Sequence, residues 1–491
     1  MVSKKLKDYL ECINELILET HDVCDFKDII TINHISYNSL DVVPCTLFIC
    51  KGQHFKNEYL EDAIGKGAVC YVAEKVMTDK IPGIIVNDIR QAINCISGEY
   101  YNHIWNEGLE CVGITGTKGK STTSFLIKSV LDYHNQKRSC GKTALVSGIY
   151  NYDGKNKQKA VLTTPETIEL HKILADSVKN KCNTLIMEVS SQGLKCKRVD
   201  DIRYKIGVFL NIGSDHISDS EHKSFREYFE TKLELFKYCE VACINSDIEE
   251  IYLDEIIQAA NQNGCEIVTF GRNELSDFRG KLLEESNKGL KIRIYHMNKQ
   301  HMLWTNLVGA CNITNLLAAF CICSVLEIPT EDILYGLKDV NIPGRMEMYD
   351  IPDKNAKIIV DYAHNKMSYE ALFETVNKVF PGYKKLFMFG CAADRAFNRR
   401  VEAGKIAEKE ADKVVITKYD DGKETFDEIC KSILECMTSE KDVQVYECRE
   451  EAIKHCISNA KDGWVIILAG CESDSAIVKK LLGEKTSKNT P

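Results

Sequence analysis

The sequence predicts an α/β protein of three domains, in which helices cover mostly parallel sheets. At 491 residues, the chain is longer than one hydrophobic core usually supports. In its middle part, apolar strand-like runs alternate with amphipathic segments; the runs are CVGIT, NTLIMEVS, IGVFLNI, VACINSD and EIVTFG. A second alternation follows toward the C-terminus, with the runs KIIVDYAH, KLFMFG, KVVITK, VQVYE and WVIILAG. Continuous apolar runs separated by helical patterns are typical of buried parallel strands.

The domain boundaries are placed where this pattern changes. Residues 1–108 contain the short runs CTLFICKG, AVCYVAE and GIIVND, and we expect a small α/β domain that begins with an amphipathic helix. Residues 109–342 hold the first alternation and predict a central parallel-sheet domain. Pro343 and Gly344 predict a linker at the start of residues 343–491. These residues are expected to form a doubly wound, Rossmann-like domain. That domain has no GxGxxG sequence, so we expect no dinucleotide there.

The composition narrows the class of protein. The formal net charge is -9 and the basic residues are spread along the chain, which argues against nucleic acid or an anionic membrane as the main partner. The 22 cysteines lie in apolar surroundings without a CxxC pair, so we expect reduced thiols in a cytoplasmic protein. No run approaches the roughly 18 consecutive apolar residues of a spanning helix, and the N-terminus does not resemble a secretory signal. Export and membrane insertion are therefore not expected.

The stretch GITGTKGKSTT predicts a phosphate-binding loop between a strand and a helix. It fails the usual Walker A spacing, because Ile114 stands where the first glycine of that motif belongs. Its backbone N–H groups and the following helix N-terminus can nevertheless cradle an anion. We expect Lys120 to reach the terminal phosphates and Ser121 to bind Mg²⁺. The alternative is a glycine-rich turn that carries a solvated lysine.

Two further strand ends supply candidate magnesium ligands. Glu188 follows the run NTLIM, and His216 follows VFLNIGSD. Carboxyl ends of neighbouring parallel strands meet at one edge of a sheet, which is where ligands bind. Taken singly, Glu188 could be a capping acid and His216 a surface residue. Their shared placement after the phosphate loop favours a joint site.

Nine motifs in order carry a resemblance to a known family. They are GITGTKGKSTT, LTTPET, MEVSSQGL, NIGSDHI, YFETKLELF, GACNITNLLAA, GRMEMYD, VDYAHN and FGCAADR. In this order they are similar to the ATP-dependent Mur ligases, and most similar to the MurE type, which adds the third amino acid to UDP-N-acetylmuramoyl-dipeptide. The stretch LFICKGQHFKNEYLEDAIGKGAVCYVAE also resembles the family's UDP-binding N-terminal domain. The resemblance therefore covers nearly the whole chain.

The resemblance implies a reaction and a set of residues for it. A carboxylate takes the γ-phosphate of ATP to become an acyl phosphate, which the incoming amine attacks, and both steps concentrate negative charge. Two Mg²⁺ sites are implied, with Ser121, Glu188, His216 and Lys232 around the metal, and Lys232 in carbamylated form. Without the family motif around it, Lys232 would be a solvated helix lysine. Positions that match the family's ATP contacts are Thr115, Gly116, Thr117, Lys118, Gly119, Lys120, Ser121, Thr122, Asn312, Asn315, Arg345, Asp361, His364 and Asp394.

Several of these nucleotide positions have simpler readings as well. The two asparagines could be helix-capping amides, and Arg345 with Asp361 could form a structural ion pair. On the acceptor side, the positions that resemble those holding the muramoyl-peptide and its phosphates are Ser39, Thr163, Thr164, Pro165, Glu166, Ser190 and Arg198. Around Ser39 the chain departs from the family's Asp-Ser-Arg, so the contacts with the UDP-sugar are less well specified than the phosphate loop.

The amino-acid side departs furthest from the family. Diaminopimelate-adding members carry Asp-Asn-Pro-Arg, whose arginine grips the distal carboxylate, whereas this chain has KYDDGKE. The family's Gly-Lys-Gly-His-Glu is replaced by GCESD. Arg400 is expected to bind the α-carboxylate, and the remaining candidates around the side chain are Asp420, Asp421, Gly470, Glu472 and Asp474. These acids favour lysine or ornithine over diaminopimelate, unless they only form solvated loops.

The sequence thus predicts an ATP-dependent ligase that uses a UDP-MurNAc-peptide and an amino acid. We expect a cytoplasmic monomer with no nucleic-acid or membrane partner. Two alternatives stay open: a paralogue that acts on a different carboxylate, as folylpolyglutamate synthases do, and a nucleotide-binding partner protein without catalysis. Lys120, Glu188, His216 and Lys232 together argue against the loss of catalysis.

Overall fold

The computed structural model describes residues 3–23, 27–52, 55–213, 221–394, 397–437, 441–471 and 473–483. It has the predicted α/β class, with sheets that are mostly parallel. The chain divides into two compact units: Met1–Arg279 with Leu316–Gly336, and Gly280–Asn315 with Leu337–Pro491. Each unit has hydrophobic cores of its own.

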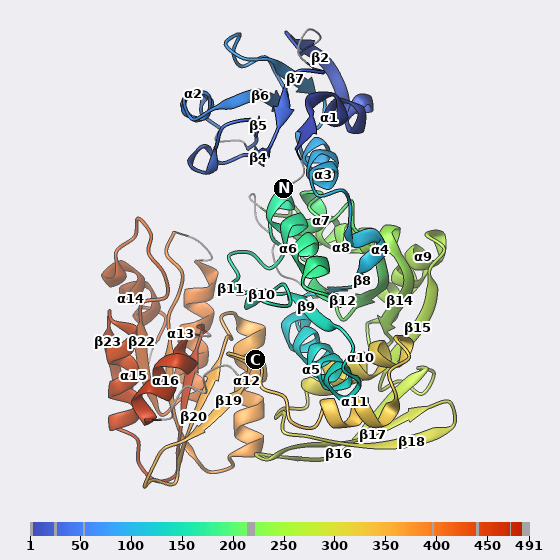
Figure 1. Ribbon diagram of the computed structural model, residues 1–491. Helices are drawn as coiled ribbons and strands as arrows, with labels where there is room; N and C mark the ends of the chain where they lie inside the picture. The colour runs from blue at the N-terminus through green and yellow to red at the C-terminus, as the bar shows by residue number, and fades with distance from the viewer. Residues whose placement is uncertain are drawn as a thin grey trace. The chain divides into compact units, whose positions relative to one another are not determined.

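The N-terminal part of the first unit is a five-stranded sheet in the order β2-β7-β6-β5-β4 (Figure 1). Its strands are β2 (Ile17–His21), β4 (His34–Ser36), β5 (Thr46–Ile49), β6 (Ala68–Ala73) and β7 (Gly83–Val86). The other elements here are β1 (Lys4–Lys5), β3 (Thr31–Ile32), α1 (Leu6–Cys12), η1 (Asn14–Leu16), η2 (Ser39–Asp41), α2 (Asn57–Gly65) and α3 (Ile89–Tyr100). The three predicted apolar runs are β5, β6 and β7.

The prediction of an amphipathic helix at the N-terminus is wrong for the second half of that stretch. Helix α1 ends at Cys12, and the residues from Ile17 to His21 form β2, which pairs antiparallel with β7. The segment ILETH contains β-branched residues, and hydrogen bonds to a fully buried neighbouring strand outweigh its weak helical periodicity.

The central sheet has the order β11-β10-β9-β12-β8-β13-β14-β15-β16-β17-β18. Neighbours from β9 to β16 pair parallel, as the apolar runs predict. The strands are β8 (Glu110–Thr115), β9 (Lys142–Val146), β10 (Tyr150–Tyr152), β11 (Lys157–Lys159), β12 (Cys182–Glu188), β13 (Tyr204–Phe209), β14 (Cys239–Asn245), β15 (Glu266–Gly271), β16 (Phe278–Ser286), β17 (Gly289–His296) and β18 (Lys299–Thr305). The helices are α4 (Trp105–Gly108), α5 (Lys120–Arg138), α6 (Thr167–Lys179), α7 (Ser191–Lys195), α8 (Phe225–Leu233), η3 (Glu234–Tyr238), α9 (Glu250–Gln262), α10 (Asn312–Val325) and α11 (Thr330–Gly336).

The second unit contains a six-stranded sheet in the order β19-β20-β24-β21-β22-β23 (Figure 1). The five strands from β20 to β23 in that order run parallel, and β19 is antiparallel to β20. The strands are β19 (Glu347–Asp350), β20 (Ala356–Asp361), β21 (Lys384–Phe389), β22 (Lys413–Thr417), β23 (Val443–Tyr446) and β24 (Trp464–Ala469). The helices are α12 (Lys366–Val379), α13 (Asn398–Glu410), α14 (Phe426–Leu434), α15 (Arg449–Ser458) and α16 (Asp474–Leu482).

This sheet is covered on both faces, as the doubly wound prediction requires. Helices α12, α13 and α14 pack on one face, where Ile359 and Ile467 contribute to the core. Helices α15 and α16 pack on the other face, where Ile358 and Ile466 contribute. Adjacent residues of one strand therefore face different cores, which explains why each run is apolar throughout.

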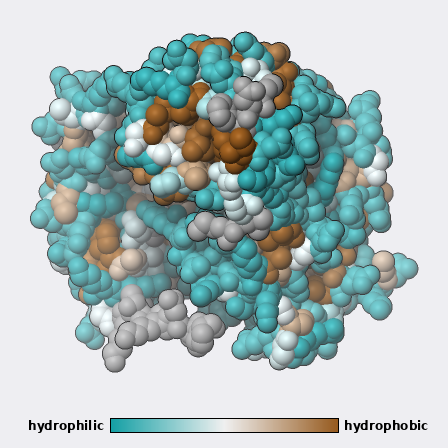
Figure 2. Space-filling view, turned by 45° about the horizontal axis from the view of Figure 1, so that its top comes forward, coloured by the Kyte–Doolittle hydropathy of each residue, from teal (hydrophilic) through white to brown (hydrophobic). Residues whose placement is uncertain are grey.

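Hydrophilic residues cover most of the face drawn in Figure 2, and the hydrophobic residues on it form separate groups. Within the described ranges, every helix is too short or too polar to cross a membrane.

A buried histidine gives the first unit a predicted sensitivity to acid. His171 on α6 has no exposed surface, its ring lies 4.6 Å from that of Trp105, and neither ring nitrogen has a hydrogen-bond partner. Burial lowers the pKa of His171 to about 4. In the unfolded chain the ring takes up a proton near pH 6.5, which the folded chain does not do until about pH 4.

We therefore expect the contribution of His171 to the free energy of unfolding to be fully present above pH 6.5 and to fall as the pH drops toward 4. At pH 5 the loss is about 2 kcal/mol, from about 1.4 kcal/mol per pH unit. Urea unfolding at pH 7.5 and pH 5 measures it, and His171→Leu should remove this part of the difference. An equal acid-induced loss in that variant and in the wild type would contradict the assignment.

Candidate active site

The predicted phosphate loop joins the end of β8 to the start of α5. Two of its glycines have positive φ, +155° at Gly116 and +85° at Gly119, and Gly119 is the N-cap of α5. The left-handed conformation at Gly119 requires glycine. A Cβ on Gly116 would lie 3.0 Å from the Cβ of Leu210, so the loop also packs closely against the segment after β13. The 19-residue helix α5 thus presents its N-terminal N–H groups at the loop, as an anion site requires.

Two lysines from different elements meet at one carbonyl of this loop. Lys120 Nζ donates to the carbonyl oxygen of Gly116 at 2.8 Å and lies 3.4 Å from that of Thr117. Lys232 Nζ, on α8, donates to the same Gly116 oxygen at 3.1 Å and lies 3.4 Å from Thr115 Oγ1. Lys232 is 1% exposed and its Nζ lies 4.6 Å from the ring centre of Tyr228. The loop therefore concentrates positive charge in a buried place.

The sequence reasoning missed the residues that hold the loop in shape. Asn211, just after β13, accepts from the backbone N–H of Lys118 at 2.9 Å and donates to the carbonyl of Lys118 at 3.0 Å. Tyr228 OH donates to Thr117 Oγ1 at 3.1 Å. A signal for Asn211 was present, because an amide directly after a strand adjacent to β8 lies at the same sheet edge as the loop.

Glu188 lies where the sequence places it, at the carboxyl end of β12 beside β8. Its side chain is 1% exposed, and Oε1 accepts from the backbone N–H of Gly148 at 2.9 Å. Ser121 and Thr122 are buried in the first turn of α5. His216 lies outside the described residues. Among the residues that are described, no three His, Cys, Asp or Glu side chains are grouped to hold a metal ion.

The candidate acceptor residues of the central part converge on the same strand end. Thr164 Oγ1 donates to the carbonyl of Glu188 at 2.9 Å and accepts from the N–H of Ser190 at 2.9 Å. Thr163 lies beside Gly148, because a Cβ added to Gly148 would be 3.4 Å from Thr163 Oγ1. Pro165 is buried in this loop. The loop therefore carries backbone and hydroxyl groups next to the Glu188 carboxylate.

The end of this loop is held by charge. Arg198 donates to the carbonyl of Thr164 at 3.0 Å and pairs with Glu166 Oε1. Lys51, which follows β5 in the N-terminal sheet, pairs with Glu166 Oε2 and lies 4.0 Å from the ring centre of Tyr37. Although burial acts in the opposite direction, the two cations hold the pKa of Glu166 below its usual value. Sequence reasoning missed Lys51, because nothing in the pattern KGQ relates it to residue 166.

Ser39 is the one acceptor candidate in the N-terminal sheet domain. It is buried at the start of η2, and its carbonyl accepts from Lys66 Nζ at 2.9 Å. The structure gives its hydroxyl no role that identifies a uridine contact.

The nucleotide candidates of the second unit form two groups. Asn312 and Asn315 are buried at the start of α10; Asn312 donates to the carbonyl of Val308 at 2.8 Å and accepts from Asn315 Nδ2 at 3.1 Å. Asp361 ends β20 and accepts from the N–H groups of Met346 at 2.9 Å and Ala363 at 2.8 Å. Burial raises the pKa of the Asp361 carboxyl, and Arg345 partly opposes this.

Arg345 and His364 both lie next to the ring of Tyr362. The guanidinium of Arg345 is 4.7 Å from the ring centre of Tyr362, and the His364 ring is 4.9 Å from it. Asp394 has φ +57° and accepts from the N–H groups of Lys423 at 2.6 Å and Glu424 at 3.0 Å. Asp394 thus stabilises the loop after β22 through these two hydrogen bonds.

The described amino-acid candidates lie on the loops and at the helix starts that follow β21, β22 and β24. Arg400 is 3% exposed and is held by Glu424 through two hydrogen bonds of 3.0 and 2.6 Å, while its Nε is buried without a partner. The guanidinium lowers the pKa of Glu424 to about 2. Asp420 accepts from the N–H of Ala393 at 2.9 Å. Gly470 has φ +99° and donates to the carbonyl of Asp361 at 3.0 Å.

The other acids do not form the open cluster that the sequence suggested. Asp421 is 93% exposed and pairs with Lys418 at 2.7 Å. Asp474 has no exposed surface, and both of its oxygens accept from Arg449 at 2.7 Å. Glu472 lies outside the described residues. Sequence reasoning missed Arg449, which begins α15 and neutralises Asp474.

This buried pair carries a stability prediction. We expect Asp474→Ala to lower the free energy of unfolding by about 3–5 kcal/mol, because it leaves the Arg449 charge buried and unpaired. Asp421→Ala, on an exposed loop of the same unit, should change it by less than about 0.5 kcal/mol. Urea unfolding compares them, and equal midpoints for the two variants would show that the pair contributes nothing.

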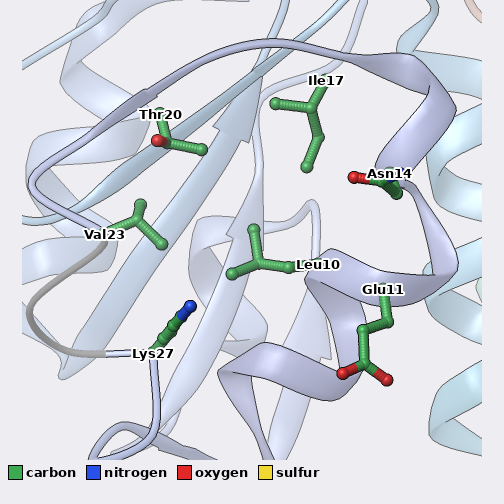
Figure 3. A pocket seen from close by; sticks show the side chains of 7 residues that line it. All are labelled: Leu10, Glu11, Asn14, Ile17, Thr20, Val23 and Lys27. Atoms are coloured by element: carbon green, nitrogen blue, oxygen red, sulfur yellow. The ribbon is translucent and has the colours of Figure 1, made fainter.

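A hollow elsewhere contains none of these candidates. It has a volume of about 410 Å³ and is formed by residues of α1, β2 and the segments around them: Leu10, Glu11, Asn14, Ile17, Thr20, Val23 and Lys27 (Figure 3). Leu10 lies near the centre of the labelled side chains. Its apolar lining carries no convergent set of catalytic groups, so the phosphate-loop edge stays the candidate active site.

Comparison with known proteins identifies the family of this chain. A family model described as the Mur ligase middle domain matches residues 114–323, and one described as the Mur ligase glutamate ligase domain matches residues 344–471. A protein of Enterococcus faecalis named UDP-N-acetylmuramoyl-L-alanyl-D-glutamate–L-lysine ligase is 34% identical over 460 residues, 90% of this chain and 86% of its own. A protein of the same name from Streptococcus thermophilus is 32% identical over 481 residues, 95% of each chain.

The fold is found in solved structures as well. That of a UDP-N-acetylmuramoyl-L-alanyl-D-glutamate–2,6-diaminopimelate ligase superposes with a TM-score of 0.67 at 20% identity and covers 99% of this chain and 100% of its own. Two family models and relatives of similar length, matched over nearly the whole sequence, leave one assignment: the chain belongs to the Mur ligase family.

Proposed function

We propose that this Mur ligase family member adds L-lysine to UDP-N-acetylmuramoyl-L-alanyl-D-glutamate at the expense of ATP, in the synthesis of peptidoglycan precursors. The observation that carries the proposal is the convergence of Lys120 and Lys232 on the Gly116 carbonyl, with Glu188 and the Thr164 loop at the next strand end. The lysine-adding names of relatives at 34% and 32% identity support the choice of amino acid.

ATP supplies the γ-phosphoryl group that turns the acceptor carboxylate into an acyl phosphate. The helix N-terminus and the loop N–H groups bind the phosphates, and Lys120 balances the charge that develops on them. Thr164 and Ser190 fix the acceptor loop beside this charge. Arg400 is the candidate for the α-carboxylate of the incoming amino acid: Glu424 orients its guanidinium, and its Nε–H has no hydrogen-bond partner.

The donor set at this edge fits magnesium. Mg²⁺ in nucleotide sites is held by one or two carboxylates and substrate phosphates and keeps several waters, so a cage of three acids is not required. The buried Glu188 carboxylate and Ser121 would hold it on the protein side, and His216 is the further candidate. When bound, the metal supplies Lewis-acid stabilisation of phosphate charge.

Carbamylation of Lys232 is part of the proposal and has a physical reason. Two ammonium groups within hydrogen-bond reach of one carbonyl repel each other in a buried site, and carbamylation of Lys232 would remove this repulsion. The neutral Nζ attacks the carbon of CO₂; a C–N bond forms, one C–O π bond opens and a proton leaves to water. The resulting carbamate replaces repulsion by Lys120 with attraction and offers oxygen ligands to a cation.

The test is phosphate release from ATP with UDP-N-acetylmuramoyl-L-alanyl-D-glutamate and a panel of lysine, ornithine, diaminopimelate and glutamate. We expect turnover with lysine and product whose mass is that of acceptor plus amino acid minus water. Turnover with diaminopimelate but not lysine would contradict the amino-acid assignment. If none of the amino acids in the panel gives phosphate release, the result would contradict the proposed acceptor and favour a paralogue that uses another carboxylate.

A further inference from the structure

The order of strands in the six-stranded sheet predicts a crevice at the carboxyl ends of its strands. Strand β24 lies between β20 and β21. Helix α16, which follows β24, packs on one face, whereas α12 and α13, which follow β20 and β21, pack on the other. Where the following helices turn to opposite faces, the carboxyl ends of the strands separate and ligands bind.

Tyr419 lies across this crevice. It follows β22, yet a Cβ on Gly390 at the end of β21 would be 3.1 Å from the Cβ of Tyr419. A Cβ on Gly470 at the end of β24 would be 3.2 Å from Tyr419 Cε2. Its side chain also lies near that of Tyr362, the first residue after β20, which helps to raise its pKa. Tyr419 thus reaches the ends of three other strands, and only glycine at 390 and 470 leaves room for it.

Part of the surface of Tyr419 remains exposed. Tyr419 is half-buried, as are its neighbours Tyr362 and Cys471. Burial raises the pKa of Tyr419, so the phenol stays neutral at physiological pH. An electron-rich face at the floor of a partly desolvated crevice attracts a cation.

The acids expected around the side-chain tip differ in their surroundings. Of the three described acids expected around the side-chain tip, Asp474 is engaged by Arg449 and Asp421 is exposed beside Lys418. Asp420 adjoins the tyrosine and is half-buried. Lys418, the nearest cation in sequence, is itself paired with Asp421 and Glu447.

We propose that Tyr419 is a specificity-determining residue, whose ring face, together with Asp420, receives the side-chain ammonium of the amino acid. The inference rests on the proposed function and refines it. It replaces the expected acidic cluster by one aromatic face and one carboxylate.

The experiment measures phosphate release by the full-length protein with ATP and acceptor, over a range of lysine concentrations. Tyr419→Leu should raise the KM for lysine about tenfold, the loss of a desolvated cation–π contact, with kcat within about twofold. Tyr419→Phe keeps the ring and should stay within about threefold of the wild-type KM. Tyr446→Leu, a tyrosine at the end of the neighbouring strand β23, is the matched control and should leave the KM unchanged.

Norleucine, which has the length of lysine without the ammonium, separates charge recognition from shape. The wild type should prefer lysine over norleucine by kcat/KM, and Tyr419→Leu should reduce that preference about tenfold. Unchanged preference in Tyr419→Leu, with the wild type active, overturns the inference and leaves the proposed function intact. A wild type that is silent with lysine overturns both. If Tyr419→Leu does not fold, the measurement is made on Tyr419→Phe. An about tenfold loss of the preference for lysine in Tyr419→Phe overturns the inference, because this variant still has the ring.

Discussion

Replacing Lys120 by alanine is expected to lower kcat by about 10³-fold or more, with a smaller change in KM for the acceptor. Its Nζ lies at the phosphate loop, 2.8 Å from the Gly116 carbonyl. A preorganised cation at developing phosphate charge contributes mainly in the transition state, and removal of even one such donor typically costs about 10²–10³-fold. Steady-state phosphate release at saturating ATP, acceptor and lysine measures the effect.

The control for Lys120 is on the same helix. Arg138 is exposed at the C-terminal end of α5, so Arg138→Ala removes a positive charge from that helix far from the loop and should retain wild-type kcat. Lys120→Arg keeps the charge but not the shape, and we expect it to recover only part of the rate. A Lys120→Ala protein with more than about a tenth of the wild-type kcat would show that the loop acts without this cation.

Lys232→Ala is expected to abolish measurable turnover, a loss of about 10³-fold, which added bicarbonate does not restore. The variant removes the amine that would take up CO₂, together with its contacts at Thr115 and Gly116. Short carboxylic acids such as acetate should restore a fraction of the rate, because they can occupy the space of the missing carbamate. In ¹³CO₂-equilibrated buffer, the wild type should show one carbamate carbon signal that Lys232→Ala lacks.

The matched control is Lys237→Ala, a half-exposed lysine on η3 that pairs with Glu234. It should keep both the carbamate signal and the rate. Full activity in Lys232→Ala would refute the role of Lys232, whereas a lost rate with no carbamate signal in the wild type would make it a plain cationic residue.

The parts of the fold that the sequence predicts are those whose pattern is local. Strands such as Cys182–Glu188 and Trp464–Ala469 are buried on both faces, so their apolar runs are continuous and visible. The strands β16, β17 and β18 were missed because half-exposed residues such as Arg279 and Arg293 interrupt their apolar positions. The pairing of Ile17–His21 with β7 depends on residues about 66 positions away, which no local window contains.

The candidate site divides in the same way. The glycines and lysine of the phosphate loop are contiguous in sequence, and Glu188 ends a strand that could be recognised by itself. The pairings Lys51 with Glu166 and Arg449 with Asp474 join residues far apart in the chain, so sequence reasoning named only one partner of each. Tyr419 belongs to the stretch KYDDGKE. Its place next to the ends of other strands depends on the strand order, which the sequence pattern does not show.

The position of β24 also dictates when the second unit can fold. It follows the other five strands of its sheet in the chain, yet it separates β20 from β21 and pairs with both along most of their length. Until Trp464–Ala469 has left the ribosome, β20 and β21 each present an open edge, and the hydrophobic residues meant for β24 are uncovered. The nascent chain must therefore hold these edges apart rather than let them pair with each other, and a protein truncated before residue 464 loses the middle of its sheet rather than an end.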